Sequence, residues 1–179
     1  MPELGPSPLM TGGDSLDVAA ARAAIAAAIR PIDGRETLPL RQALGRVLAE
    51  DVISPIDVPA HDNSAMDGYA FAGSALADGA ETVLRVAATV HAGDVPTMTT
   101  APGDCVRIMT GAVMPPGLDT VVPQELCRLE GGRIRIAPGT LRVGDNRRLR
   151  GEDLSRGRPA VAAGRRLRPA DLGLIASLG

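Results

Sequence analysis

The sequence predicts an α+β fold that is β-rich, and three observations support this. The 179 residues include 21 glycines and 15 prolines, a share typical of many turns and short elements rather than of a helical bundle. The middle of the chain holds short segments rich in β-branched residues, bounded by Gly or Pro. Helical patterns lie near both ends. Hydrophobic residues make up 45% and aromatic residues only 1%, so we expect a core of Ala, Val, Leu, Ile and Met.

The chain begins with a Pro- and Gly-rich segment, residues 1–13, for which we predict a flexible tail. Residues 14–32 predict a helix, because nearly all of its interior residues are good helix formers. Asp14 or Ser15 can cap this helix, and Pro31 ends it. The apolar residues of this helix are distributed around its whole circumference, so we expect burial on more than one side.

Extended segments follow the helix. Residues 36–40 and 46–54 are joined by a turn of helix that Gly45 closes. Residues 164–179 predict a strand end that leads into a helix starting near Pro169. Between these regions, β-branched residues predict strands in four segments: 82–90, 104–112, 119–130 and 132–138.

One of these segments carries a hairpin signal. In LEGGRIRI, residues 129–136, the Gly131–Gly132 pair can adopt the positive φ angles of a tight turn. The arginines at 133 and 135 alternate with the isoleucines at 134 and 136, so one face of this strand is expected to be exposed to solvent and the other buried.

Composition excludes several classes of function. The net charge of −2 and the near absence of aromatic residues argue against a nucleic-acid partner. No apolar run approaches the roughly 20 residues of a membrane span, and the N-terminus does not resemble a signal peptide. Cys105 and Cys127 form no CxxC motif, and His61 and His91 have no zinc-ligand spacing relative to them. We therefore expect a reduced, cytoplasmic setting.

Residues 61–71, HDNSAMDGYAF, concentrate polar groups and hold the chain's only tyrosine and only phenylalanine. The stretch SAMD can form a single helical turn, with Gly68 supplying the reversal. Asp67 would then be presented at a rigid corner, while Tyr69 and Phe71 return to a strand. The alternative is that Asp62 and Asp67 only stabilise turns.

Two further stretches carry candidate chemistry. The backbone N–H groups of Thr110-Gly111-Ala112, at the end of a predicted strand, could form an anion-binding nest, unless this is an ordinary strand-loop-strand connection. The second stretch is Arg-rich and contains Arg147, Arg148 and Arg150. Arginine forks suit phosphates and oxyanions, but the neighbouring Glu152 and Asp153 make internal ion pairs equally plausible.

The order of these stretches is specific. DNSAMDGYA is followed by RIMTGA, then by PPGLDTVVPQE, then by RRLRGED. This series resembles the molybdopterin molybdenumtransferase family, which comprises the MoeA-type bacterial proteins and the gephyrin E domain. The resemblance covers residues 15–179.

The resemblance implies a function and a domain organisation. The family inserts molybdenum from molybdate into adenylylated molybdopterin and releases AMP, using a divalent cation such as magnesium. Its members are homodimers with four domains per subunit. The chain resembles the first two: an extended helical domain formed from 15–52 and 155–179, and an inserted domain of short mixed β-sheets, 53–154. The third and fourth family domains are absent from this sequence.

The resemblance also implies site residues. Asp67 and Thr110 match positions that line a cleft facing the partner subunit, and we predict both as catalytic. Arg147, Arg148 and Arg150 are predicted as cofactor-binding residues that contribute positive charge near that cleft. No metal site is expected within this chain, which we expect to be inactive alone. Contacts with other proteins of molybdenum cofactor synthesis are implied as well. The alternative is a non-catalytic dimerisation or interaction module, because gephyrin uses the same scaffold as an interaction platform.

Overall fold

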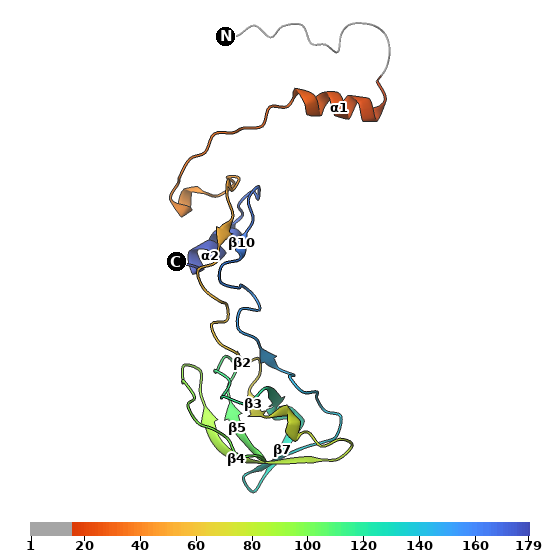
Figure 1. The fold of residues 1–179 in the computed structure, drawn as a ribbon, viewed down its shortest axis with the longest axis vertical. Helices are drawn as coiled ribbons and strands as arrows, with labels where there is room; N and C mark the ends of the chain where they lie inside the picture. The colour runs from red at the N-terminus through yellow and green to blue at the C-terminus, as the bar shows by residue number, and fades with distance from the viewer. Residues whose placement is uncertain (1–15) are drawn as a thin grey trace. The chain divides into compact units, whose positions relative to one another are not determined.

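The computed structural model describes residues 16–179, which divide into two compact units at Thr37 and Leu38 (Figure 1). The predicted tail 1–13 and the predicted caps Asp14 and Ser15 lie outside the described residues. The described elements confirm the α+β, β-rich fold. The helices are α1 (Val18–Ala28) and α2 (Pro169–Ser177), and the 3-10 turns are η2 (Leu40–Gln42), η3 (Gly73–Ala75) and η4 (Gln124–Leu126).

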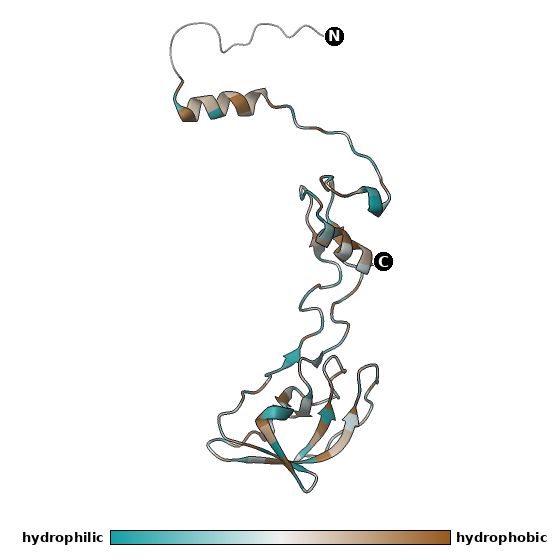
Figure 2. Ribbon diagram, turned by 180° about the vertical axis from the view of Figure 1, so that it is seen from behind, coloured by the Kyte–Doolittle hydropathy of each residue, from teal (hydrophilic) through white to brown (hydrophobic). Residues whose placement is uncertain are grey.

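The first unit contains α1, which the sequence predicts slightly longer. Its cap is Asp17, whose carboxylate accepts a hydrogen bond of 2.7 Å from the Ala20 N–H. Figure 2 shows that apolar residues follow much of this helix. The expected burial on more than one side is wrong for this chain, since no α1 residue is buried and Ile25 is 60% exposed. Among the described residues of the first unit, α1 is the only helix or strand, so no other element of that part covers its apolar side chains.

The second unit holds every strand found among residues 16–179. These are β1 (Val52–Ile53), β2 (Asn63–Ser64), β3 (Gly68–Phe71), β4 (Thr82–Val90), β5 (Asp104–Ile108), β6 (Thr120–Pro123), β7 (Cys127–Glu130), β8 (Arg133–Ile136), β9 (Arg147–Arg148) and β10 (Pro159–Val161). Two short antiparallel pairs, β1–β10 and β2–β9, join early segments of the unit to late ones. The helix α2, which follows β10 in the sequence, lies beside it in Figure 1. The domain boundaries at 52/53 and 154/155 stay a prediction.

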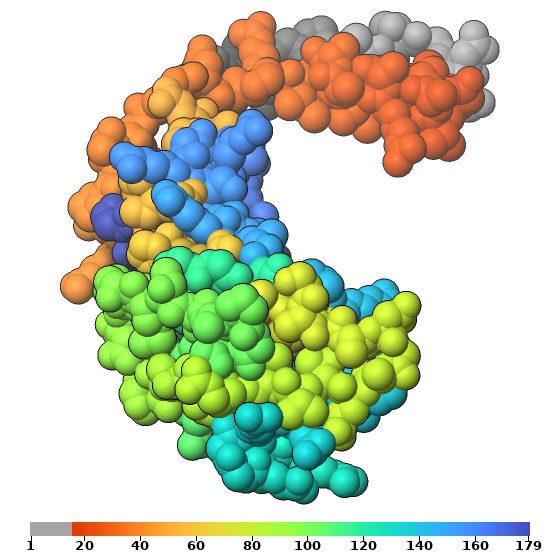
Figure 3. All heavy atoms as spheres, turned by 60° about the horizontal axis from the view of Figure 1, so that its bottom comes forward, coloured from red at the N-terminus to blue at the C-terminus, as the bar shows by residue number. Residues whose placement is uncertain are grey.

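Six strands form one curled sheet in the order β6-β3-β5-β4-β8-β7 (Figure 1). Only the β4–β5 pair is parallel. The segments coloured yellow through cyan, which include β3 to β8, form one closely packed body (Figure 3). The predicted hairpin is confirmed: β7 and β8 pair antiparallel, and Gly131 and Gly132 have φ angles of 56° and 74°.

The two faces of the sheet carry two apolar clusters. Cluster 1 contains Ala70, Val90, Val106, Ile108, Ala112, Met114, Leu118 and Val121. Cluster 2 contains Tyr69, Phe71, Leu84, Cys105, Val122, Ile134 and Ile136. Alternate residues of β3 and β5 enter opposite clusters because successive strand side chains point to opposite faces. Both aromatic residues of the chain thus anchor β3 within cluster 2.

Within residues 16–179, neither helix is long and apolar enough to cross a membrane.

Candidate functional site

The motif of residues 61–71 runs from β2 into β3 through a bend at 65–67. The Ser64 hydroxyl donates to the Met66 carbonyl at 2.6 Å, and the Met66 N–H donates back to that hydroxyl at 3.3 Å. These bonds form a side-chain-stabilised turn of the kind that Ser favours. The predicted helical turn over SAMD is therefore wrong. The competing interaction is strand pairing on both sides of the bend, which keeps the backbone extended.

Gly68 has a different role from the predicted one. Its φ is not positive, so it supplies no reversal. Instead, β3 passes so close to β6 that a Cβ at Gly68 would lie 2.0 Å from the Val122 carbonyl oxygen. Glycine is needed here for close approach of two backbones.

The structure brings the two predicted catalytic residues together. Both the backbone N–H and the hydroxyl of Thr110 donate to Asp67 Oδ1, each at 2.7 Å. Both residues are exposed. The contact follows from sheet register, because β3 pairs with β5 and Thr110 lies just beyond the end of β5. The two donors hold Oδ1 and leave Oδ2 available to a ligand.

These contacts set the charge of Asp67. The Thr110 N–H, followed by the Thr110 hydroxyl, lowers the pKa of the Asp67 carboxyl below its ordinary value of 3.8, and the positive charge of Arg107 acts in the same direction. Asp67 is therefore ionised at neutral pH. Because the pKa is lowered on folding, this contact stabilises the folded chain above the ordinary pKa, and the contribution is lost as the pH falls through the lowered value.

The predicted anion-binding nest is wrong in its details. The Gly111 N–H donates to the Ser64 carbonyl at 2.8 Å, and the Ala112 N–H donates to the Met109 carbonyl at 2.9 Å. The Thr110 N–H does bind an anion, but that anion is the Asp67 carboxylate of the same chain. The tripeptide therefore positions Asp67 instead of holding a free ion.

The Arg-rich stretch pairs with carboxylates of the same chain. Arg148 bonds to Asp153 at 2.6 Å and also to Glu152, and Arg150 bonds to Asp57 at 2.6 Å. Arg147 lies 3.8 Å from Asp62. The internal ion pairs, one of the two alternatives, are thus present. A role of these arginines toward substrate stays a prediction.

Asp62 links two segments that are distant in the sequence. Its carboxylate accepts the Arg150 N–H at 2.8 Å, which ties the start of the motif to the Arg-rich stretch. Its role in this structure is therefore structural, but the partner is 88 positions away and not in the same turn. Asp67 differs, because Thr110 alone holds its carboxylate, through Oδ1, and Oδ2 has no hydrogen-bond partner among residues 16–179.

Sequence reasoning missed Arg107. The residue lies within RIMTGA, where only Thr110 and its neighbours are predicted to have a role. The available signal was a charged residue that interrupts an apolar strand at Cys105-Val106-Arg107-Ile108, between buried neighbours.

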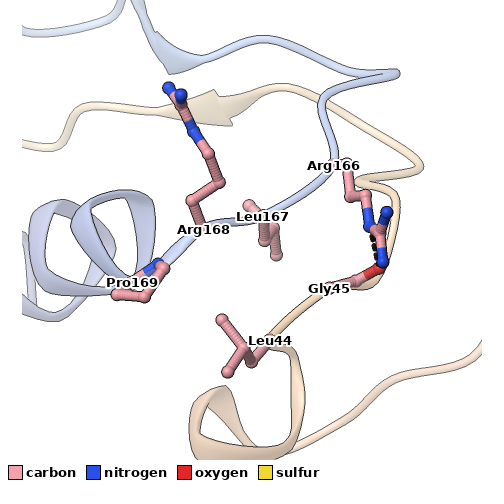
Figure 4. Close-up of a pocket in the computed structure, with 6 residues that line it drawn as sticks. All are labelled: Leu44, Gly45, Arg166, Leu167, Arg168 and Pro169. Carbon is pink, nitrogen blue, oxygen red and sulfur yellow. Dashed lines mark hydrogen bonds between the residues drawn. The ribbon is translucent and has the colours of Figure 1, made fainter.

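Other candidate sites lie elsewhere. A pocket of about 410 Å³ lies between Leu44-Gly45 and Arg166–Pro169, with the Arg166 side chain donating to the Gly45 carbonyl at 3.2 Å (Figure 4). It includes neither Asp67 nor Thr110. Among residues 16–179, no group of three or more His, Cys, Asp or Glu side chains could hold a metal ion.

Replacing Thr110 by Val is expected to raise the pKa of Asp67 toward 3.8, because the hydroxyl donor is lost. The rise should be incomplete, since the backbone N–H, the larger contributor, remains. NMR titration of the Asp67 carboxyl carbon measures this pKa. Thr110→Ser, which keeps a hydroxyl, is the control and should leave the pKa close to that of the unaltered chain. An equal pKa in all three proteins would show that the hydroxyl does not act on Asp67.

Comparison with solved structures defines the class of protein to which this fold and site correspond. The molybdopterin biosynthesis MoeA protein of Pyrococcus horikoshii matches with a TM-score of 0.74 and 34% identity, over 84% of this chain and 40% of that one. A second structure of the MoeA protein from the same organism matches with a TM-score of 0.66, over 79% of this chain and 37% of that one.

The family follows from the sequence match. Residues 16–179 match the family defined as the MoeA N-terminal region (domain I and II), and the chain belongs to this family. The molybdopterin molybdenumtransferase of Haemophilus influenzae is 43% identical over 145 residues, which are 80% of this chain and 35% of that protein. Molybdopterin molybdenumtransferase 2 of Mycobacterium tuberculosis is 40% identical over 156 residues, which are 85% of this chain and 37% of that protein. The chain thus spans little more than a third of these relatives.

Proposed function

We propose that the chain acts in molybdenum cofactor biosynthesis as the N-terminal portion of a transferase. The transferase inserts molybdenum from molybdate into adenylylated molybdopterin and releases AMP. The observation that carries this proposal is the Asp67 carboxylate, which Thr110 holds through one oxygen at the end of a sheet. The names of the relatives supply the substrate class.

Asp67 serves as a positioning group in this proposal. A general base works best when its pKa lies near the operating pH, and the lowered pKa of Asp67 makes it a poor proton acceptor at pH 7. An ionised carboxylate with one open oxygen can accept a hydrogen bond from a substrate or a metal-bound water. Thr110 acts through Asp67, and its two donors fix the direction of the carboxylate.

The remaining parts of the reaction belong to residues outside this chain. Magnesium is proposed as the cofactor of the whole transferase. Among residues 16–179, no group of three or more His, Cys, Asp or Glu side chains could hold it by itself. A homodimer, a cytoplasmic setting and contacts with other proteins of the pathway complete the proposal.

A chimera tests this function. Residues 16–179 replace the matched segment of the Haemophilus influenzae relative, which is 43% identical to this chain over that segment. The chimera is expected to release AMP from adenylylated molybdopterin only when molybdate and magnesium are present. The same relative without its matched segment is the control and should be inactive. A folded chimera that releases no AMP, beside an active parent, would favour the alternative of a non-catalytic interaction module.

A further inference from the structure

Three polar side chains lie in register across three adjacent strands. In the β3–β5 pair Tyr69 is opposite Arg107, and in the β4–β5 pair Arg107 is opposite Thr89. Directly opposite residues of neighbouring strands share a face and have Cβ atoms roughly 4.5–5.5 Å apart in an antiparallel pair. Thr89, Arg107 and Tyr69 therefore form a row, which we call the polar row.

The polar row begins where cluster 2 ends. Cys105, two residues before Arg107 on the same face, is fully buried in cluster 2. Tyr69 belongs to the same cluster and is 6% exposed, whereas Arg107 and Thr89 are exposed. The tyrosine ring thus closes the apolar cluster, and the next two members of the row face solvent.

The hydrogen-bonding groups of the row are unused. Within residues 16–179, the side chains of Thr89, Arg107 and Tyr69 make no hydrogen bond or ion pair to another residue. The Tyr69 hydroxyl is not among the fully buried polar atoms that lack a partner. Arg148 and Arg150, by contrast, are each held by carboxylates.

The polar row adjoins the Asp67–Thr110 contact. Asp67 lies two residues before Tyr69, and Thr110 lies three residues after Arg107. The charge of Arg107 acts on both neighbours: it contributes to the lowered pKa of Asp67, and it partly offsets the burial that raises the pKa of Tyr69. Arg107 nevertheless makes no ion pair with Asp67 among the described contacts, so its guanidinium is available beside the carboxylate.

We propose that Thr89, Arg107 and Tyr69 bind a tetrahedral oxyanion next to Asp67. A guanidinium presents several N–H donors in a planar fork that suits oxyanions, and two hydroxyls on either side can donate to the remaining oxygens. The proposal rests on the proposed function for the identity of the ligand. Both proposed substrates carry such groups: molybdate itself, and the phosphates of adenylylated molybdopterin.

The test is an NMR titration of the ¹⁵N-labelled 179-residue chain with sodium molybdate, inorganic phosphate and AMP in separate samples. We expect at least one of these anions to shift the Arg107 Nε–H resonance together with the amide resonances of residues 69 and 89. A response to molybdate alone assigns the row to the metal oxyanion. A response to AMP and phosphate assigns it to the phosphates of the second substrate.

Variants separate a built site from general charge attraction. Arg107→Gln is expected to weaken binding by about tenfold or more, because hydrogen bonds to charged groups are lost. Arg128→Gln is the matched control, since it removes the same charge from an exposed position on β7, on the opposite face of the same sheet. Thr89→Val and Tyr69→Phe should each weaken binding by a smaller factor. Arg107→Lys should bind more tightly than Arg107→Gln but less tightly than the unaltered chain.

Two results would overturn the proposal. One is the absence of any shift at residues 69, 89 and 107 with all three anions. The other is equal weakening by Arg107→Gln and Arg128→Gln, which would indicate nonspecific attraction. The chimera keeps these failures distinct from failure of the proposed function. An active chimera with no anion binding refutes only the polar row, whereas specific binding with an inactive chimera refutes only the transferase.

Discussion

Asp67→Ala in the chimera is expected to lower the rate of AMP release by about 100-fold or more, while the unfolding temperature changes little. A group that acts in the transition state typically contributes a factor of this order. Asp67 is exposed and its carboxylate contacts only Thr110 among residues 16–179, so its removal creates no cavity. Steady-state AMP release and thermal unfolding of the same preparations measure both quantities.

Asp62→Ala is the matched control for Asp67. It removes a carboxylate from the same motif, but one that accepts the Arg150 N–H and lies near Arg147. We expect it to lower the unfolding temperature more than Asp67→Ala and to leave the rate within about tenfold, since the loss of a hydrogen bond between two chain segments acts mainly on stability. If Asp67→Ala instead lowered the unfolding temperature more than Asp62→Ala and the rate less, Asp67 would serve turn stabilisation alone.

Mixed dimers test whether Asp67 serves the site of the partner subunit. An Asp67→Ala chimera is paired with a chimera that is disabled in the portion beyond residue 179. If the site combines both subunits, one site per mixed dimer receives two intact halves and activity returns. Mixed dimers, verified by two affinity tags, that stay as inactive as either parent would place Asp67 in its own subunit's site. Failure to form any dimer would refute the proposed homodimer itself.

Gly68→Ala is expected to destabilise the 179-residue chain by about 3 kcal/mol or more, at the upper end of the effect of overpacking. The added Cβ would lie 2.0 Å from the Val122 carbonyl oxygen, which belongs to backbone and cannot rotate away. Because β3 is paired on both sides, with β5 and β6, it cannot shift without loss of hydrogen bonds. Urea unfolding monitored by circular dichroism measures the change in free energy.

Gly173→Ala provides the control for Gly68. Gly173 lies in α2, its φ is not positive, and a Cβ added there would meet no heavy atom within 4 Å outside its own helix turn. The substitution is expected to stabilise the chain by up to about 1 kcal/mol, because Ala is the better helix former. Equal midpoints for the two variants would show that β3 and β6 separate more easily than the structure indicates.

Much of the fold could be predicted from the sequence because the signals are local. The strand predicted over residues 82–90 coincides with β4. The arginines at 133 and 135 are exposed, and the isoleucines at 134 and 136 are 0% and 1% exposed, as their alternation predicts. The predicted start of the last helix at Pro169 is confirmed by α2.

Other features could not be predicted because they depend on residues distant in the sequence. Asp67 and Thr110 are 43 positions apart, and only the β3–β5 pairing brings them together. The family resemblance points to both residues, but nothing local indicates that they contact each other. The predicted helical turn at SAMD failed for the same reason, because propensity gave way to strand pairing on either side.

The contacts of the 65–67 bend and of Ser64 before it determine how precisely the carboxylate of Asp67 is held. Ser64 exchanges backbone hydrogen bonds with the 110–112 segment, donating to the Ala112 carbonyl at 2.9 Å and accepting the Gly111 N–H at 2.8 Å. The bend is thus fastened to the segment that follows β5 by these two bonds and by the Asp67–Thr110 contact, and its thermal displacement should follow that of the sheet. When a ligand binds at Asp67, the side chain is already ordered and loses little conformational entropy. Binding then avoids a cost of about 0.5–1.5 kcal/mol, the usual cost of immobilising one side chain.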